Sequence, residues 1–157
     1  MPTARSIISV KKCALAMGWL IALSPCIAAA ALGEPETSVP TDVKQMRGSL
    51  KLSVHASYRQ HEIRLPSGTL VREFAGPDGK VFAVAWNGPT VPNLRQTLGR
   101  YFDAFASAAK DKHAGRNRIQ IRQSELVVQS SGHMRAFVGR AYLPLQIPSG
   151  VELGDLR

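Results

Sequence analysis

Two histidines of this sequence stand beside residue types that hydrolytic enzymes use. His61 is followed by Glu62, the opening of a zinc motif whose second histidine must come four residues after the first. That position holds Leu65, and the segment alternates like a strand, on which neighbouring side chains point to opposite faces. The sequence therefore predicts no metal site here. It predicts a half-buried His61 and a solvent-facing Glu62 near Arg64.

His133 follows Ser130, Ser131 and Gly132, and a serine near a histidine suggests nucleophilic catalysis. However, the chain has no G-x-S-x-G turn that would expose a nucleophile. Adjacency in sequence also does not supply the hydrogen-bond geometry that a catalytic base needs. We interpret His133 as a turn residue that opens the last long strand. A hydrolase-type enzyme that uses His133 or His61 remains the alternative function.

Five basic residues lie between positions 110 and 122, with Asp111 as the one acid among them. They could contact an anionic surface through weak, salt-sensitive attraction, or they could be a solvated helix end and strand edge. No aromatic residues interleave with these charges to stack bases, so nucleic-acid binding is not predicted. The candidate anion contacts are Lys110, Lys112, Arg116, Arg118 and Arg122.

Other ligand-binding patterns are missing from the sequence. No glycine loop matches a phosphate-binding or dinucleotide-binding pattern, so no cofactor is predicted. Trp86 ends the most apolar predicted strand. We interpret Trp86 as a core residue or strand-end cap rather than a platform for a ligand.

The first thirty residues have the order of a cleavable signal peptide. Their charged residues are all basic, and an apolar run, residues 13–23, follows them. The run is shorter than the roughly 20 residues of a membrane-spanning helix. Small residues then end the segment at a spacing that signal peptidase reads. We predict export with cleavage after Ala30 and no transmembrane segment in the mature protein. The alternative is a lipid-anchored Cys26, which the preceding Pro25 disfavours.

Removal of this segment changes the composition of the chain. Both cysteines leave with it, which excludes thiol catalysis and disulfides in the mature protein. It also takes three of the 20 Lys and Arg and none of the 11 Asp and Glu, so the mature net charge is +6. A basic protein in the envelope is expected to meet anionic lipid or polysaccharide rather than nucleic acid.

Alternating apolar and polar residues from Gly48 onward predict a series of strands. Turn signals separate them at Pro66-Ser67-Gly68 and at Gly76-Pro77-Asp78-Gly79. The predicted strands cover residues 50–54, 58–65, 69–74, 80–86, 118–130 with a possible break, and 133–143.

A spacing of three and four residues between apolar positions predicts one amphipathic helix between Pro92 and Gly115. Gly99 weakens this helix by about 1 kcal/mol relative to alanine. The apolar stripe consists of Leu94, Leu98, Tyr101, Phe102, Phe105 and Ala109. We expect the helix and the sheet to share one core, built around Val81, Phe82, Val84, Leu98, Phe102 and Phe105.

Together these patterns predict an α+β fold, an antiparallel β-meander of about six strands packed against one long amphipathic helix. The predicted organisation is a signal peptide at 1–30, a loose leader at 31–47, a single α+β domain at 48–143 and an irregular tail at 144–157. Such folds host many functions, so the architecture does not predict one.

Three stretches of the chain resemble a family of exported proteobacterial proteins, domain of unknown function 2844. They are residues 61–74, 81–89 and 131–144, and the resemblance extends from about Leu32 to Val151. It implies a bacterial envelope protein but supplies no activity, cofactor or catalytic residue. The resulting expectation is a periplasmic or secreted binding module that is not an enzyme, with an unknown envelope component as its partner.

Overall fold

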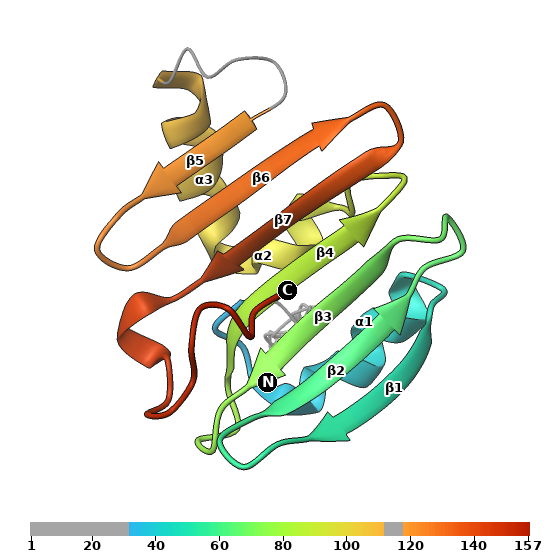
Figure 1. The fold of residues 1–157 in the computed structure, drawn as a ribbon, viewed down its shortest axis with the longest axis vertical. Coiled ribbons are helices and arrows are strands. Elements are labelled where there is room, and N and C mark those ends of the chain that lie inside the picture. The colour runs from blue at the N-terminus through green and yellow to red at the C-terminus, as the bar shows by residue number, and fades with distance from the viewer. Residues whose placement is uncertain (1–31, 112–117) are drawn as a thin grey trace, which may run out of the picture.

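Seven strands form one antiparallel sheet in the computed structural model, which describes residues 32–111 and 118–157. The strand order is β1-β2-β3-β4-β7-β6-β5, so the first four strands follow the chain and β7 then returns to pair with β4 (Figure 1). The strands are β1 (Ser49–Val54), β2 (Arg59–Arg64), β3 (Leu70–Ala75), β4 (Val81–Gly88), β5 (Arg118–Arg122), β6 (Val127–His133) and β7 (Ala136–Tyr142).

Short helices cover one face of this sheet, and the C-terminal segment crosses the opposite face (Figure 1). We call the first the helix side and the second the helix-free face. The α-helices are α1 (Val39–Gln45), α2 (Leu94–Leu98) and α3 (Phe102–Asp111). The 3-10 helices are η1 (Glu36–Ser38), η2 (Gly99–Tyr101) and η3 (Pro144–Gln146).

The predicted α+β arrangement of about six meandering strands against one long helix is wrong. The structure has a seven-stranded antiparallel sheet and only short helices. The expected long helix breaks at Gly99, whose backbone has φ 50° and ψ −125° and ends α2. Residues with a side chain rarely adopt this conformation, so glycine does more here than weaken the helix. A 3-10 turn then links α2 to α3.

The additional strand comes from residues 118–130, which were predicted as one strand with a possible break. It folds into the β5–β6 hairpin, in which the Gln123 N–H donates to the Leu126 carbonyl at 2.8 Å. The antiparallel pairing predicted from short turns between strands is confirmed throughout the sheet. The order of the strands is not a simple meander, because β5 lies at an edge and β7 lies in the middle.

The sheet has a hydrophobic cluster on each face rather than the single core that was predicted. A β-bulge leaves Phe82 between Val81, which pairs with Ala75, and Ala83, which pairs with Phe74. Val81 consequently belongs to the helix-side core, whereas Phe82 packs in the cluster on the helix-free face. Phe102 is only partly buried, so its expected place at the centre of the core is also wrong.

Both ends of the described chain contribute to these clusters. Leu32 and Val39, from the predicted leader, are fully buried in the helix-side core. Leu156, from the predicted tail, is 1% exposed and packs with Phe74 and Phe82 on the helix-free face. The C-terminal segment thereby covers the apolar part of a face that no α-helix of the described residues covers.

Candidate functional site

His61 takes part in an ion-pair network rather than an open site. Its ring lies on the helix side of β2, is 7% exposed, and places Nε2 2.7 Å from the Glu36 carboxylate. The Arg59 guanidinium donates from Nε to both oxygens of the same carboxylate. The Arg59 hydrogen bonds lower the pKa of Glu36 from its ordinary value of 4.5, against the effect of burial, and His61 lowers it further. The network ties η1 to β2.

Glu62 points to the opposite face, where it accepts a hydrogen bond from Arg72 at 3.0 Å. His61 and Glu62 therefore do not share a site. Within the described residues, no group of histidine, cysteine, aspartate and glutamate side chains could hold a metal ion. No helix of the described part is long and apolar enough to cross a membrane.

His133 lies at the end of β6 rather than at the start of β7, opposite Ala136 in the β6–β7 hairpin. Met134 and Arg135 make the turn, and Arg135 has a φ of 63°. The His133 side chain is exposed, and no hydrogen bond to it occurs within the described part of the chain. The structure thus does not bring His133 and His61 together.

The predicted basic run is divided by the fold. Lys110 lies in α3 on the helix side, whereas the side chains of Arg118 and Arg122 belong to the helix-free face of β5. Lys112 and Arg116 lie outside the described residues. The described members of the run therefore lie on different faces of the sheet, and only Arg118 among them lines a groove.

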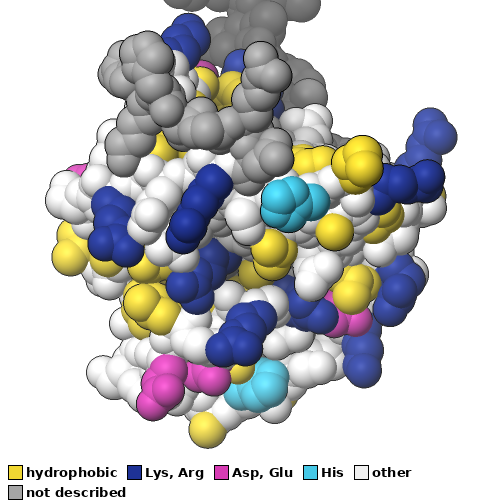
Figure 2. Space-filling view, turned by 45° about the horizontal axis from the view of Figure 1, so that its top comes forward, with side chains coloured by type: hydrophobic (Ala, Val, Ile, Leu, Met, Phe, Trp, Pro, Cys, Tyr) yellow, Lys and Arg dark blue, Asp and Glu magenta, His cyan; other side chains and the backbone are white. Residues whose placement is uncertain are grey.

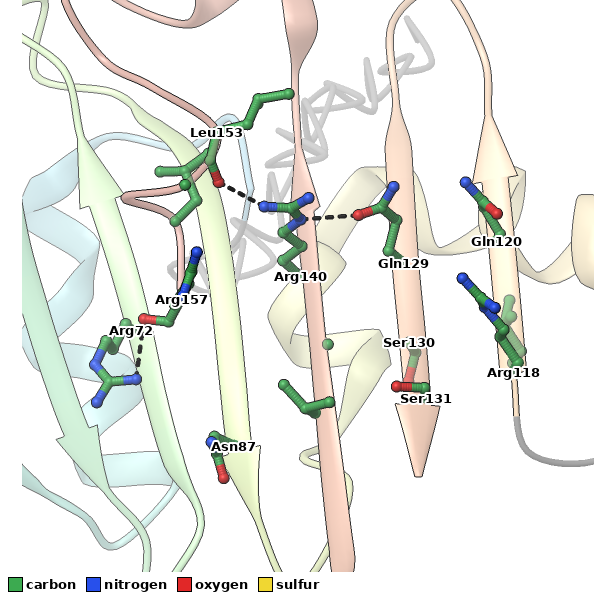
Figure 3. Close-up of a pocket in the computed structure, with 15 residues that line it drawn as sticks. Arg72, Asn87, Arg118, Gln120, Gln129, Ser130, Ser131, Arg140, Leu153 and Arg157 are labelled. Atoms are coloured by element: carbon green, nitrogen blue, oxygen red, sulfur yellow. Dashed lines mark hydrogen bonds between the residues drawn. The ribbon is translucent and has the colours of Figure 1, made fainter. Parts of the chain in front are cut away.

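This groove has a volume of about 590 Å³ and lies on the helix-free face (Figure 3). Two rows of residues that run across the strands form its floor. On each strand the two rows are two residues apart, so their side chains point to the same face. The inner row contains Arg72, Ala85, Arg140, Gln129 and Gln120 in order across the sheet. The outer row contains Asn87, Val138, Ser131 and Arg118.

The next row on the same face is apolar and is covered by the C-terminal segment. It contains Phe74, Ala83, Tyr142 and Val127, which pack with Leu156. Arg122 lies opposite Val127 at the end of this row, outside the groove. The helix-free face is thus divided into a covered apolar part and an open polar part.

The C-terminal segment also forms one wall of the groove. Arg140 donates from Nε to the Gln129 side chain at 2.9 Å and from Nη1 to the Leu153 carbonyl at 2.5 Å. Arg72 donates from Nη1 to the Arg157 backbone oxygen at 3.0 Å. These bonds hold two guanidinium groups at the groove in defined positions, as Figure 3 shows.

The charged side chains that line the groove are all basic. Four arginines line it, and no aspartate, glutamate or aromatic residue does. Arg72 has an ion-pair partner, Glu62, whereas no ion pair or hydrogen bond to the Arg118 side chain occurs within the described residues. Figure 2 shows Lys and Arg side chains spread over this side of the molecule, with few acidic ones among them. The arginine side chains are Arg72, Arg118, Arg140 and Arg157.

Comparison with known proteins identifies the family. The model of a family described as protein of unknown function (DUF2844) matches residues 28–156. The chain belongs to the DUF2844 family. No curated protein and no solved structure matches it.

Most of the groove of this DUF2844 chain was missed by sequence reasoning. Arg72, Arg140 and Arg157 are far apart in sequence and do not form a run of charge. A signal was present in the alternation, because Arg72 and Arg140 occupy the polar positions of predicted strands. That signal does not reveal which strands are neighbours, so it could not bring these arginines to one site.

Proposed function

We propose that this protein is an exported, non-catalytic binding module that holds an anionic polysaccharide of the bacterial envelope in the groove on its helix-free face. The observation that carries the proposal is the set of four arginines in a groove without an acidic residue. Guanidinium groups bind carboxylates and phosphates through paired, charge-assisted hydrogen bonds. Groove arginines already oriented by backbone carbonyls lose little freedom on binding.

The shape and chemistry of the groove favour a chain of sugars. Its inner row runs from β3 to β5 across four strand spacings, or roughly 19 Å at about 4.8 Å each. Between the arginines it offers the amides of Asn87, Gln120 and Gln129 and the Ser131 hydroxyl, which suit sugar hydroxyls. The apolar part of this face is covered by the C-terminal segment, which disfavours insertion among lipid tails.

Nucleic acid fits this groove less well than polysaccharide does. The lining has no aromatic side chain on which bases could stack. Export would also separate the protein from nucleic acid. Neither His61 nor His133 lines the groove, so we do not put forward hydrolysis by either histidine as a second function.

The location rests on residues 1–30, which lie outside the described part of the structure. Their order of basic, apolar and small residues supports export to the periplasm or beyond, with cleavage after Ala30. N-terminal sequencing of the protein recovered from the envelope should begin at Ala31. A chain that begins at Met1 would refute cleavage, and a lipid-modified Cys26 would support the lipoprotein alternative.

Binding should be measured against oligogalacturonate, with neutral dextran and anionic phospholipid vesicles as comparison ligands. Arg118→Gln should lower affinity for oligogalacturonate by about 10- to 100-fold, because a hydrogen bond to a charged group contributes about 1.5–3 kcal/mol. Lys110→Gln removes an equal charge on the helix side and should leave affinity nearly unchanged. Arg118→Lys should recover only part of the affinity, since lysine cannot make a two-pronged contact.

Three results would contradict the proposal. Equal losses in Arg118→Gln and Lys110→Gln would show diffuse attraction by net charge. Tighter binding to vesicles than to oligogalacturonate would assign the surface to lipid. Equal binding to dextran would show that the arginines do not select an anion.

A further inference from the structure

Strand β1 forms an edge of the sheet with little protection against pairing with another strand. Its outer side has no strand partner among the described residues. Leu50, Leu52 and Val54 are 42%, 52% and 74% exposed. They point to the helix side, because Leu50 pairs with the core residue Ile63. Monomeric proteins usually protect an edge with charges, proline, a bulge or a covering helix.

The opposite edge of the same sheet shows such protection. β5 carries Arg118 and Arg122 at its two ends, and α3 packs against it over the buried Ile121. β1 instead pairs regularly with β2 over six consecutive residues, without a bulge, and its one charged residue is Lys51. α1 also contacts β1, but it leaves Leu50, Leu52 and Val54 exposed, so β1 is the edge better suited to accept a strand.

The free backbone groups of β1 belong to the same residues as its exposed apolar side chains. The His55 N–H donates to the Tyr58 carbonyl at 2.9 Å, which makes these two residues a hydrogen-bonded pair. Hydrogen-bonded and non-hydrogen-bonded pairs alternate along an antiparallel ladder. By this alternation, the backbone N–H and C=O groups of three β1 residues form no hydrogen bonds with β2: Leu50, Leu52 and Val54. These groups point away from β2, to the outer side of the edge.

We propose that two copies of the chain pair antiparallel through β1, about a two-fold axis at Leu52. In this register Leu52 lies opposite its own copy and Leu50 lies opposite Val54, so all the outward backbone groups meet in hydrogen-bonded pairs. Lys51 lies opposite Ser53. An axis at Lys51 would instead place two lysines opposite each other, which is unfavourable. The edge is thus complementary to itself in the register about Leu52.

The dimer would have one continuous sheet, with seven strands from each copy. A two-fold axis perpendicular to the sheet keeps both helix-free faces on the same side, so the two grooves would face the same ligand. A long polymer could then occupy both grooves and gain from the linked binding. The pairing itself does not depend on what the grooves bind, so the two proposals can fail separately.

Sedimentation velocity of the purified protein over a concentration series tests the dimer. We expect a species of twice the monomer mass that dissociates on dilution. Leu52→Lys places two like charges at the axis and should yield the monomer mass alone. Leu145→Lys changes another exposed leucine, 81% exposed outside β1, and should leave the dimer intact. A monomer at every concentration, or equal dissociation by both variants, would overturn the proposal.

A crosslinking experiment covers the case in which Leu52→Lys fails to fold. Hydrogen-bonded antiparallel residues have Cα atoms about 5.5 Å apart, within the range that a disulfide bridges. Leu52→Cys should therefore form a disulfide-linked dimer on mild oxidation, whereas Leu145→Cys and the parent should not. Absence of the link in folded Leu52→Cys would exclude the proposed register.

Discussion

At the residue scale, the most unusual group in the structure is the Glu73 side chain. It lies fully buried on the helix side of β3, and neither carboxyl oxygen has a hydrogen-bond partner within the described residues. Burial raises the pKa of Glu73 well above its ordinary value of 4.5, and the Asp42 carboxylate adds to the rise. A carboxyl group in such surroundings is stable in its neutral form.

This shift predicts how stability depends on pH. The folded pKa of Glu73 exceeds the unfolded value, so the folded state binds more protons between the two values. The contribution of Glu73 to the free energy of unfolding is therefore fully present below about pH 4.5. It is lost as the pH rises through the folded pKa, at up to about 1.4 kcal/mol per pH unit. Glu73→Gln removes the ionisation, so its stability relative to the parent should rise over this range.

Urea unfolding at a series of pH values measures this effect. Glu125→Gln is the matched control, because Glu125 is exposed in the β5–β6 turn and its loss should leave the parent's pH profile unchanged. If Glu73→Gln also follows the parent's profile, Glu73 is ionised in the folded protein and the physical account of its burial is wrong.

At the element scale, close contact between β4 and β7 depends on a glycine. Gly139 lies opposite Trp86, and the indole ring occupies the space where a side chain would be. A Cβ atom at Gly139 would lie 2.3 Å from the Trp86 Cζ2 atom and 2.9 Å from the Gln129 carbonyl. Trp86 is 1% exposed on the helix side, in agreement with its interpretation as a core residue.

Gly139→Ala should lower the free energy of unfolding by about 1–3 kcal/mol, the usual cost of overpacking a core. Gly154→Ala is the control, since no atom lies within 4 Å of a Cβ built there. Adding Trp86→Phe to Gly139→Ala should restore part of the loss by making room for the methyl group. Thermal or urea unfolding of the three variants gives the comparison. Equal stability of Gly139→Ala and Gly154→Ala would contradict the proposed contact.

At the scale of the whole molecule, the C-terminal segment joins the fold to the groove. Its Leu156 is buried over the apolar row, and Arg140 and Arg72 bind backbone oxygens of the same segment. Loss of the Leu156 anchor should therefore affect stability and ligand binding together, because the segment both covers a core and forms the groove wall.

Leu156→Ala should reduce the free energy of unfolding by about 2–5 kcal/mol, the range for a buried leucine. Leu145→Ala should change it by less than about 0.5 kcal/mol, since that side chain is 81% exposed. Below the unfolding transition, Leu156→Ala should also bind oligogalacturonate more weakly than Leu145→Ala does. Similar stability of the two variants would mean that the segment does not pack on the sheet in solution.

The sequence alone was sufficient for the local features of this molecule. Alternation along 58–65 and an apolar run at 80–86 predicted strands, and the antiparallel pairing that short turns favour is confirmed. The resemblance to the DUF2844 family is confirmed by the match over residues 28–156. These features depend on residues close together in the chain or on motifs, so they can be recognised without knowing the fold.

Tertiary structure decided the helix break, the strand order and the groove. A glycine at position 99 can continue or end a helix, and only the structure shows that it ends α2. The pairing of β7 with β4 is a long-range contact without a local signal. That pairing places Arg72, Arg140 and Arg118 on one face, although no short segment contains them. Periodicity indicates which side of a strand is polar, but neighbours across a sheet depend on the packing of the whole chain.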